Sequence, residues 1–463
     1  MVKNPEITIT MEKGDKIMSI PRILYYKYKL DKNLNKSRSE ILKLRENKFR
    51  KLLYYAYNNS PFYRDFYSAH GIKEKDLSEI KHSDLPALDK NIMMENYDKL
   101  VTDKNISCDK IASFLENSPS PVSKLNNKYH VIHSSGSSGE VGYFLYNSKE
   151  WDFIKALSLR LFTNFGLKRK RYAFIGAADG HYAGISLFLS PVNALEEYFY
   201  KQYLVININH PLEDYCQRLN ECRPHNLTGY PFGIKVLAEM QRTGKIDISP
   251  EVVICGGEPL TAAARKFIKK TWDTSLINYY AASESLVIGV KKEEFNHLYI
   301  FDDANYIETA EEGYYLTNLY NYTQPLIRYR MSDLLVSVNE QKNEDRWPFN
   351  RVKEIIGRQE DILWFKNQAE KKEFIHPIIF VELYIRGLNK YQVIQTGETS
   401  FIFKAVIKKG SKNEDVIVKI KEELTKILQS KNLQNVNFRI KKVKNIDGAG
   451  TTGKFKLIKR EFK

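Results

Sequence analysis

The chain has 463 residues, which is too long for one simple hydrophobic core and predicts two or three domains. Its content of 43% hydrophobic and 13% aromatic residues excludes extensive disorder, and four cysteines are too few for a disulfide framework. A polar N-terminus and the lack of any apolar run of roughly 18 residues predict neither a signal peptide nor a membrane span, so we expect a cytoplasmic protein.

The net charge of +16 is concentrated near the C-terminus, where residues 404–463 hold 17 Lys and Arg against 6 Asp and Glu. Such a region could bind nucleic acid, an acidic membrane face or a polyphosphate substrate, or it could be an ordinary solvated surface. No zinc-finger, RNP or helix-turn-helix signature accompanies the charge. Cys216, Cys222 and His225 lie close together, but their spacing matches no standard zinc pattern.

The N-terminal part is predicted to be a helical layer without chemistry of its own. Ser37 and Glu40 have the spacing of a capping box, and apolar residues recur on one helical face over 37–57. A turn at 59–63, a second short helical stretch to Gly71 and a punctuated connection at 85–90 follow.

Residues 129–142 form the first stretch that suggests binding chemistry. The β-branched run Tyr129–Ile132 predicts a strand, and it leads into a loop of four serines and two glycines at 134–139. Glycines allow the backbone N–H groups to approach a ligand, and hydroxyl groups can follow phosphate oxygens. The loop lacks the Gly-Lys-Ser/Thr ending of a Walker P-loop. Alone, it could equally be a flexible linker.

From Lys128 onward, helical and strand patterns alternate, which predicts an α/β fold with a parallel or mixed sheet covered by helices. Strand-like segments then dominate between Asp303 and Val338, including 314–319 and 326–330, and a polar linker is expected at 341–350. The helical runs are 150–165, 211–222, 231–243 and 260–271, and the apolar runs are 172–177, 203–208, 251–255 and 275–280.

The last 100 residues or so predict a small α+β unit. Two strands, 391–396 and 400–408, precede an amphipathic helix opened by Ser411 and Glu414, and a strand at 436–443 follows. The apolar face of that helix is expected to comprise Val416, Ile420, Leu424, Ile427 and Leu428.

Four further stretches contain residue types that suit a nucleotide site. The Gly256-Gly257 turn would let a planar ligand approach the backbone. Tyr280 could stack on a purine and Glu284 could hold Mg²⁺, while Asp333 could accept hydrogen bonds from two ribose hydroxyls. Singly, each stretch also has an ordinary interpretation: a turn, a carboxylate at a helix start, the solvent face of a strand or a basic tail. The fourth stretch is the pair 357–361 and 450–454.

Together these stretches resemble the motifs of the acyl-adenylate-forming superfamily, and in particular of its phenylacetate–CoA ligase branch with the CapK-like proteins. The resemblance covers about residues 50–460, and the segment Pro325–Leu334 carries the most specific match, to Pro-Leu-Ile-Arg-Tyr-Arg-Thr-Gly-Asp-Leu. The other matches are Ser134–Gly139 to the phosphate loop, Tyr280–Glu284 to Tyr-Gly-x-Thr-Glu, Gly357–Asp361 to the hinge, and Thr452–Lys454 to the catalytic-lysine loop.

The chain departs from the family pattern at several positions. Ala281 and Ser332 replace glycines, Glu360 replaces the usual hinge aspartate, and the lysine loop lacks its leading proline. The charged residues of the motifs are retained. The resemblance therefore implies acyl-adenylate formation and leaves open which acid and which acceptor are used.

The resemblance implies a large mixed-sheet domain over 1–357 that binds AMP and the acid, and a small mobile α+β domain over 358–463. It implies an ATP-dependent ligase that uses Mg²⁺ and a small carboxylic acid, with CoA as the acceptor. Two alternatives remain: an adenylate-forming amide synthase or acyl-protein synthetase that uses an amine or a protein thiol, and a nucleic-acid-binding protein on a degenerate ligase scaffold. Neither a nucleic-acid partner nor an oligomeric state is implied.

Each implied site residue has a role carried over by motif. Lys454 and Arg328 are expected to be catalytic, Glu284 to hold Mg²⁺, and Glu360 to be the hinge. An acid pocket is expected near Gly180, His181 and Tyr182. The residues expected to bind ATP or AMP are Ser134, Ser135, Gly136, Ser137, Ser138, Gly139, Gly257, Glu258, Pro259, Tyr280, Ala281, Ser283, Asp333 and Arg358.

Overall fold

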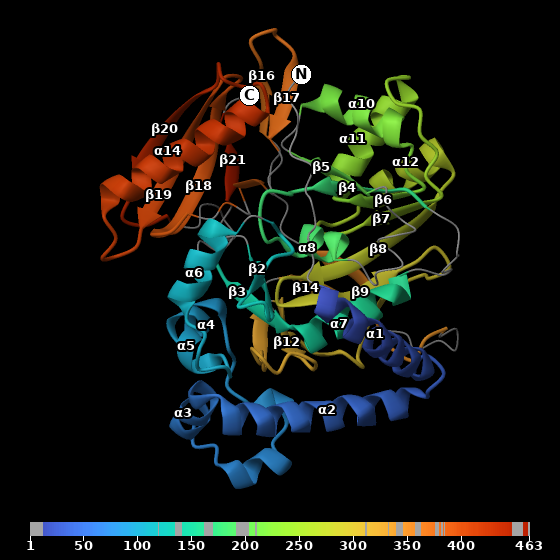
Figure 1. Cartoon of the computed structure of the whole chain (residues 1–463), viewed down its shortest axis with the longest axis vertical. Coiled ribbons are helices and arrows are strands. Elements are labelled where there is room, and N and C mark those ends of the chain that lie inside the picture. The colour runs from blue at the N-terminus through green and yellow to red at the C-terminus, as the bar shows by residue number, and fades with distance from the viewer. Residues whose placement is uncertain are drawn as a thin grey trace.

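The structure is a computed structural model, and it confirms the predicted α/β fold (Figure 1). In the described residues, no helix is both long enough and apolar enough to span a membrane. The structure describes residues 13–118, 120–134, 141–161, 170–190, 203–208, 211–310, 313–331, 333–338, 346–356, 363–375, 379–380, 383, 385–446 and 457–461.

The central element is a mixed sheet in which nine described strands follow the order β14-β15-β10-β9-β8-β7-β6-β4-β5. The half from β8 to β5 is parallel, as the alternating pattern predicts. The half from β8 to β14 is antiparallel. The strands are β4 Tyr172–Gly176, β5 Tyr203–Asn207, β6 Asn226–Gly229, β7 Val252–Cys255, β8 Ser275–Ala282, β9 Ser285–Lys291, β10 Leu298–Ile300, β14 Leu334–Ser337 and β15 Asn350–Ile356.

Helices cover both faces of the parallel half. Successive side chains of a strand point to opposite faces of the sheet, so the contacts of β4 show what packs on each face. Ala173 and Ile175 pack into the core formed with α10 to α12, whereas Phe174 packs with Ile185 of α8. The helices of this region are α7 Ser148–Ser158, η3 Leu159–Leu161, α8 Ala183–Leu189, α10 Leu212–Cys222, α11 Pro231–Arg242 and α12 Ala262–Trp272.

The direction of winding reverses between β4 and β6. The chain passes from β4 to β5 at the sheet edge, and then returns to β6 on the other side of β4. In open α/β sheets, ligands bind outside the carboxyl ends of the strands at such a reversal. The two strands end here at Gly176 and Gly229.

Two small sheets and a helical layer complete the large unit. Residues 326–330 were expected to be a strand, but only β13, Tyr329–Met331, forms, because Arg328 has a positive φ of 51°. The sheets are β1 Lys124–Leu125, β2 Tyr129–His133 and β3 Tyr143–Asn147, and β11 Asn305–Ala310, β12 Gly313–Asn318 and β13.

The N-terminal helical layer agrees with the predicted capping box. Ser37 Oγ accepts a hydrogen bond from the backbone N–H of Glu40, and the Glu40 carboxylate accepts one from the N–H of Ser37 at 2.8 Å. Helix α1, which contains Pro21, was not predicted. The helices are α1 Lys13–Asn33, α2 Arg38–Asn59, α3 Pro61–Ala69, η1 Glu74–Ser78, η2 His82–Asp84, α4 Lys90–Glu95, α5 Tyr97–Leu100 and α6 Cys108–Asn117.

The C-terminal part forms a separate sheet, β20-β19-β18-β21, with one helix packed on it. All five residues expected on the apolar face of that helix are buried. Its predicted start was wrong, because Lys412 is at the N-cap and no side chain caps the helix. The elements are β16 Leu363–Lys366, β17 Lys372–Ile375, β18 Leu388–Gly397, β19 Ser400–Ile407, α14 Asn413–Ser430, β20 Asn437–Lys442 and β21 Ile458–Arg460.

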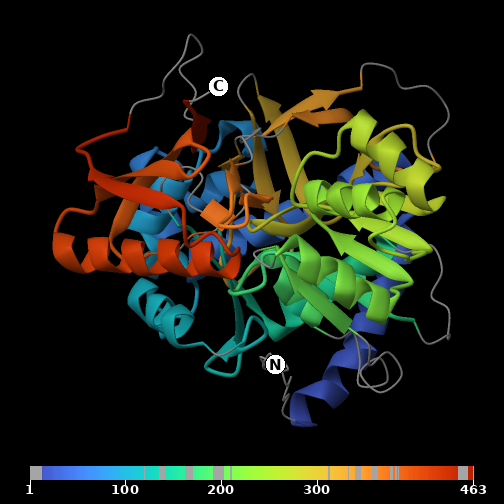
Figure 2. The same cartoon turned by 90° about the horizontal axis from the view of Figure 1, so that it is seen from above.

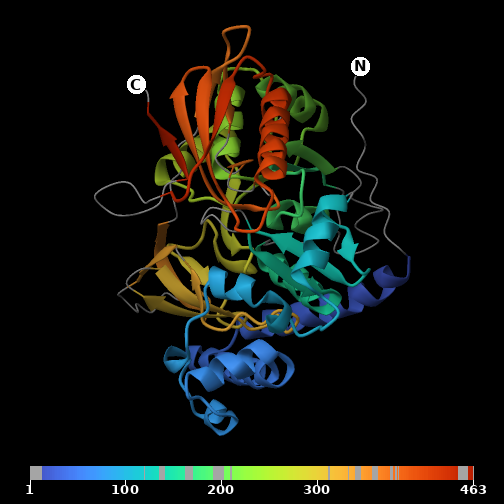
Figure 3. The same cartoon turned by 90° about the vertical axis from the view of Figure 1, so that its left-hand side faces the viewer.

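The C-terminal part lies beside α10 and α11 of the large unit, as Figures 2 and 3 show. The rings of Phe374 and Phe232 meet edge to face at 5.2 Å. Lys431 of the C-terminal part is fully buried, with its Nζ 5.7 Å from the ring centroid of Tyr215 in α10 and 3.5 Å from the Glu373 carboxylate. Apolar side chains and one buried ion pair therefore form part of this contact.

The prediction of a linker at 341–350 is wrong for residues 346–350, which the structure describes. Trp347 and Phe349 pack into the main core, and Asn350 begins β15 of the large sheet. Residues 339–345 and 357–362 lie outside the described residues, so a domain boundary at 357/358 and a hinge at Glu360 stay predictions.

Candidate adenylate site

The tight turn between β8 and β9 places Ser283 and Glu284 at one end of the central sheet. Ala282 pairs with Ser285, so only these two residues form the turn, and Ala281 lies at an irregularity between successive strand pairs. Tyr146 donates its hydroxyl to the carbonyl of Ser283 at 2.7 Å. The interpretation of Glu284 as a carboxylate at a helix start is therefore wrong, because a fixed β-turn holds it.

Tyr280 and Asp333, which the sequence separates by 53 residues, meet in a direct hydrogen bond. The Tyr280 hydroxyl lies 2.7 Å from Asp333 Oδ2 and 2.7 Å from the hydroxyl of Tyr314. Burial raises the pKa of Tyr280 well above its usual value, so the hydroxyl stays protonated and donates to the carboxylate. The residues expected to bind adenine and ribose therefore lie within one hydrogen bond of each other.

Glu284 lies close enough to this pair to interact with it electrostatically. Its side chain is only 9% exposed, and burial raises the pKa of its carboxyl group. The nearby charge of Asp333 acts in the same direction, whereas Lys90 and a hydrogen bond from Tyr329 lower the pKa. Glu284 is thus a buried carboxylate, and a further cation nearby would stabilise its ionised form.

The Gly-Gly-Glu-Pro turn follows β7 directly and borders a crowded aromatic surface. Gly257 has a φ of +82°, and a Cβ on it would lie 2.8 Å from the ring of Tyr230. A Cβ on Gly256 would lie only 2.2 Å from the ring of Tyr279. Both positions therefore require glycine. Glu258 and Pro259 come next, and Glu258 Oε2 lies 3.5 Å from the backbone N–H of Phe232 at the start of α11.

The two ends of the predicted phosphate loop are tied together at the end of the β2–β3 hairpin. Ser134 donates its backbone N–H to the carbonyl of Gly142 at 2.7 Å, and its Oγ accepts from the N–H of Gly142 at 3.0 Å. Ser135, Gly136, Ser137, Ser138 and Gly139 lie outside the described residues.

Two buried side chains connect this hairpin to the other motifs. Gln324, which is fully buried at the start of the 324–334 motif, accepts from the N–H of Leu145 at 2.8 Å and donates to the carbonyl of Tyr143 at 2.9 Å. Tyr146 of the same strand reaches the β8–β9 turn, as described above. Strand β3 therefore holds the base of the phosphate loop, the Glu284 turn and the Asp333 motif in one arrangement.

The expected acid-pocket residues lie next to the base of the phosphate loop. Gly180 and His181 follow the carboxyl end of β4, at the reversal of winding, and the His181 carbonyl accepts from the N–H of His133 at 3.2 Å. The ring of Tyr182 meets that of His133 edge to face at 4.6 Å. The Nε2 of His181 lies 2.6 Å from Ser118 Oγ. The structure thus brings these three residues beside Ser134.

Arg328 is not brought into this cluster. Its guanidinium pairs with Glu308 at 2.9 Å, donates to the carbonyl of Leu85 at 2.6 Å and lies 4.3 Å from the ring centroid of Tyr315. Glu308 and Tyr315 are paired across β11 and β12, whereas Tyr314 precedes Tyr315 and points to the opposite face. These contacts support a structural role for Arg328, and a catalytic role for it stays a prediction.

Three predicted site residues and one alternative remain. Lys454, Arg358 and Glu360 lie outside the described residues. In the part of the chain that is described, no group of three or more His, Cys, Asp or Glu side chains could hold a metal ion. Around the cysteines noted in the sequence, the Nδ1 of His225 instead accepts a backbone hydrogen bond from Arg171 at 3.0 Å.

Sequence reasoning missed Tyr314, Tyr146 and Lys90 as parts of the site. Tyr314 lies in a predicted strand and Tyr146 in β3, which was not predicted, and each contributes through a hydroxyl that reaches another strand or turn. Lys90 lies at the start of α4, more than 190 residues before the turn on which its charge acts. No local pattern distinguishes these residues from core or surface residues.

Known proteins share sequence or fold with this chain. No family model matches the chain. Protein CapK of Staphylococcus aureus is 24% identical over 407 residues, which is 83% of this chain and 83% of CapK. A crystal structure of 2-hydroxyisobutyryl-CoA ligase with 2-HIB-AMP and CoA covers 98% of this chain and 94% of that chain, with a TM-score of 0.58 and 17% identity. The same ligase in its postadenylation state with R3-HIB-AMP covers 97% and 94%, with a TM-score of 0.55 and 17% identity.

These comparisons show that the chain is similar in sequence to CapK, as the resemblance predicts. They also show that the chain has the fold of an acyl-CoA ligase over nearly its whole length. The comparisons identify neither the acid and the acceptor nor the roles of individual site residues.

Proposed function

We propose that this protein is an ATP-dependent ligase that converts a small carboxylic acid to an acyl-adenylate, releases pyrophosphate, and passes the acyl group to CoA. The observation that carries the proposal is the hydrogen bond of 2.7 Å between Tyr280 and Asp333, with Glu284 beside it. An aromatic ring, a ribose acceptor and a buried carboxylate are thereby brought together from two distant motifs.

In this proposal the Tyr280 ring stacks on adenine and Asp333 accepts hydrogen bonds from the ribose hydroxyls. The Tyr280 hydroxyl, itself held by Tyr314, fixes the carboxylate before ATP arrives. Because Gly257 has no side chain, the backbone of this turn can approach the edge of the purine ring. The loop from Ser134 to Gly139 surrounds the phosphates.

The chemical difficulty is that a carboxylate must approach a polyphosphate, so negative charge has to be neutralised without reorganising the site. Glu284 fits a Mg²⁺ site, because this ion commonly takes one or two protein carboxylates together with substrate phosphates. Mg²⁺ bound there would supply positive charge to the phosphate oxygens. The burial of Glu284 agrees with such a role.

The C-terminal part supplies the remaining groups in this proposal. Lys454 provides a compact positive charge to the carboxylate and the α-phosphate, and Arg358 lies near the ribose. The small domain closes for adenylation and rotates about Glu360 for acyl transfer. The basic residues of 404–463 favour a polyphosphate acceptor such as CoA.

The acid is proposed to be small and aromatic or otherwise hydrophobic. Aromatic rings meet at this place, Tyr182 against His133 and Phe114 against His181, and burial lowers the pKa of His181 to about 4 and that of His133 to about 3. Both histidines are therefore neutral at pH 7, so the wall near Tyr182 carries no charge from them. A neutral aromatic surface favours an apolar acyl group.

A screen of carboxylic acids for acid-dependent exchange of pyrophosphate into ATP tests this proposal. One acid or a narrow chemical group of acids should give exchange well above the rate without acid. The active acid is then offered CoA, amino acids, amino sugars and carrier protein in parallel. Formation of the acyl-CoA supports the proposed acceptor, and an amide or an acyl-protein would replace it. Failure of every acid would overturn the proposal, and a steep salt dependence of nucleic-acid binding would then favour the binding-protein alternative.

A further inference from the structure

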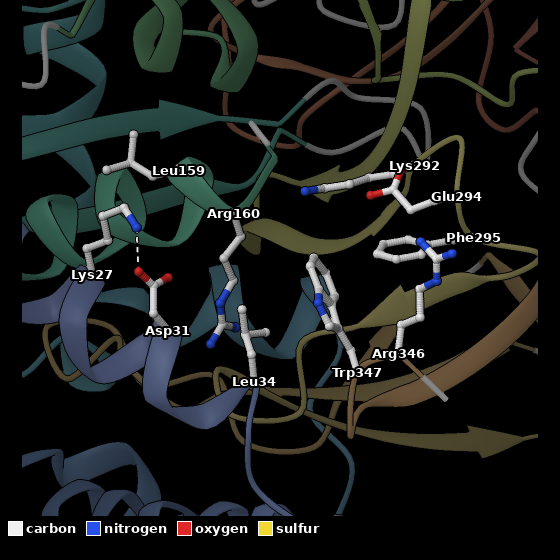
Figure 4. Close-up of a pocket in the computed structure, with 10 residues that line it drawn as sticks. All are labelled: Lys27, Asp31, Leu34, Leu159, Arg160, Lys292, Glu294, Phe295, Arg346 and Trp347. Atoms are coloured by element: carbon white, nitrogen blue, oxygen red, sulfur yellow. Dashed lines mark hydrogen bonds and ion pairs between the residues drawn. The ribbon is translucent and has the colours of Figure 1, made fainter. Parts of the chain in front are cut away.

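A cavity of about 490 Å³ lies on a part of the molecule that the proposed function does not use (Figure 4). It is bordered by α1, by η3, by the segment after β9 and by residues 346–347. Strand β9 starts next to Glu284 and ends next to Lys292. At about 3.4 Å per residue, the first and last residues of this seven-residue strand are roughly 20 Å apart. The cavity is therefore distinct from the candidate adenylate site.

Lys292 is the unusual residue of this cavity, because its side chain is buried but has no counter-ion. It is 5% exposed, and Figure 4 shows its amino group directed into the space between Arg160 and Trp347. Among the described residues, no carboxylate pairs with its Nζ, which lies 5.1 Å from the ring centroid of Trp347. Burial lowers the pKa of Lys292, and the charge of Glu294 only partly offsets this. The Nζ itself is not fully enclosed by protein, so an anion in the cavity can reach it.

The other buried or half-buried cations nearby differ from Lys292 in having partners. Arg160 forms hydrogen bonds to both carboxylate oxygens of Asp303, and Lys27 pairs with Asp31. Arg346, at the cavity rim, is exposed and has no ion pair among the described residues. Lys292 and Arg346 thus provide positive charge that the surrounding protein does not neutralise.

Apart from the carboxylate of Glu294, the remaining wall of the cavity is apolar and aromatic. The ring of Trp347 is held edge to face against Phe295 at 4.8 Å, and Leu34 and Leu159 lie on the opposite side. A planar apolar group can pack on such a ring. Because the indole is already held in place, little side-chain entropy is lost when a ligand binds. The cavity therefore combines unneutralised positive charge with an aromatic surface.

We propose that this cavity binds a small aromatic anion, with its phosphate or carboxylate group on Lys292 and Arg346 and its ring against Trp347. Such a ligand would provide the counter-ion that Lys292 lacks. Because the site lies at the far end of β9 from Glu284, binding there does not depend on the proposed adenylation activity.

Titration of the full chain with phenyl phosphate tests this proposal, with calorimetry and tryptophan fluorescence as two independent measurements. Saturating AMP is present throughout, so that the candidate adenylate site cannot account for binding. We expect one binding event that changes tryptophan fluorescence, and at least tenfold weaker binding of inorganic phosphate. Lys292→Met should weaken phenyl phosphate at least tenfold. Lys245→Met, which removes an exposed lysine elsewhere on the surface, should leave the affinity unchanged.

Trp347→Leu provides a second variant in case Lys292→Met does not fold. It should abolish the fluorescence change and weaken binding several-fold. Unchanged affinity in a folded Lys292→Met or Trp347→Leu variant would overturn the proposal, as would the absence of phenyl phosphate binding while saturating AMP is present. Loss of pyrophosphate exchange in other variants would not affect this result, so the two proposals can fail separately.

Discussion

Substitution of Asp333 by alanine tests the nucleotide site where the structure is most informative. In the variant, the two ribose hydroxyls of bound ATP lose the Asp333 carboxylate that is proposed to accept their hydrogen bonds. Hydrogen bonds to charged groups contribute about 1.5–3 kcal/mol, so the dissociation constant for ATP should rise roughly 10- to 150-fold. The fold should survive, because the Tyr280 hydroxyl keeps its second partner, Tyr314, at 2.7 Å. We expect the free energy of unfolding to fall by about 1 kcal/mol or less.

Calorimetric titration with ATP measures this change, and a denaturation curve checks the fold. Asp247→Ala is the matched control, because its carboxylate is 83% exposed and, among the described residues, pairs only with Arg223 at the surface. Tyr280→Phe is a milder perturbation that keeps the ring but removes the hydroxyl from Asp333. It should weaken ATP only about three- to tenfold, and the double variant should be less affected than the sum of the two free-energy changes.

Unchanged affinity for ATP in a folded Asp333→Ala variant would refute the assignment of Asp333 to the ribose. Additive effects of Tyr280→Phe and Asp333→Ala would refute the idea that the hydrogen bond between them prepares the site.

Three further substitutions address the C-terminal part. Lys454→Ala should abolish pyrophosphate exchange while ATP binding by calorimetry largely persists, and near wild-type exchange would contradict the assigned role. Glu360→Pro should leave exchange within a few-fold of wild type but lower overall product formation at least tenfold, because proline fixes φ at the proposed hinge; equal loss of both activities would contradict this. Burial lowers the pKa of Lys431 to about 8, so the folded chain binds fewer protons than the unfolded chain above that pH. The free energy of unfolding of the wild type should therefore rise by on the order of 3 kcal/mol between pH 7.5 and 10.5, relative to the change in Lys431→Met over the same range. Denaturation at each pH measures both proteins. Parallel pH profiles of the two proteins would contradict the burial argument.

Elements with a strong local pattern could be predicted from the sequence. The buried face of α14 and the strands β4, β5, β7 and β8 follow directly from the spacing or continuity of apolar residues. The start of α14 could not be located, since Ser411 has the right side chain for a cap but does not occupy the cap position. Tertiary packing decides such ends, not local composition.

The wrong predictions have identifiable physical causes. The polar character of 341–350 concealed Trp347 and Phe349, which pack into the main core. The apolar run at 326–330 is buried but is not a continuous strand, because Arg328 takes a left-handed conformation while its guanidinium pairs with Glu308. In both cases long-range contacts override the local pattern.

The candidate site could be predicted in composition but not in geometry. Its motifs are visible in the sequence because each resembles a known family motif. The contact between Tyr280 and Asp333 joins β8 to the segment between β13 and β14, and because three strands separate β8 from β14 in the sheet, no local pattern specifies it. The structural role of Arg328, and the parts played by Tyr314 and Tyr146, appear only when the register of the neighbouring strands is known.

The transfer of an ¹⁸O label from the acid to AMP tests the central claim most directly. In the proposed reaction a carboxylate oxygen of the acid bonds to the α-phosphorus and remains there when the acceptor takes the acyl group. With the most active acid labelled in its carboxylate, mass spectrometry should find one ¹⁸O atom in each AMP released. Label in inorganic phosphate together with ADP formation, or no label in any nucleotide product, would contradict acyl-adenylate formation.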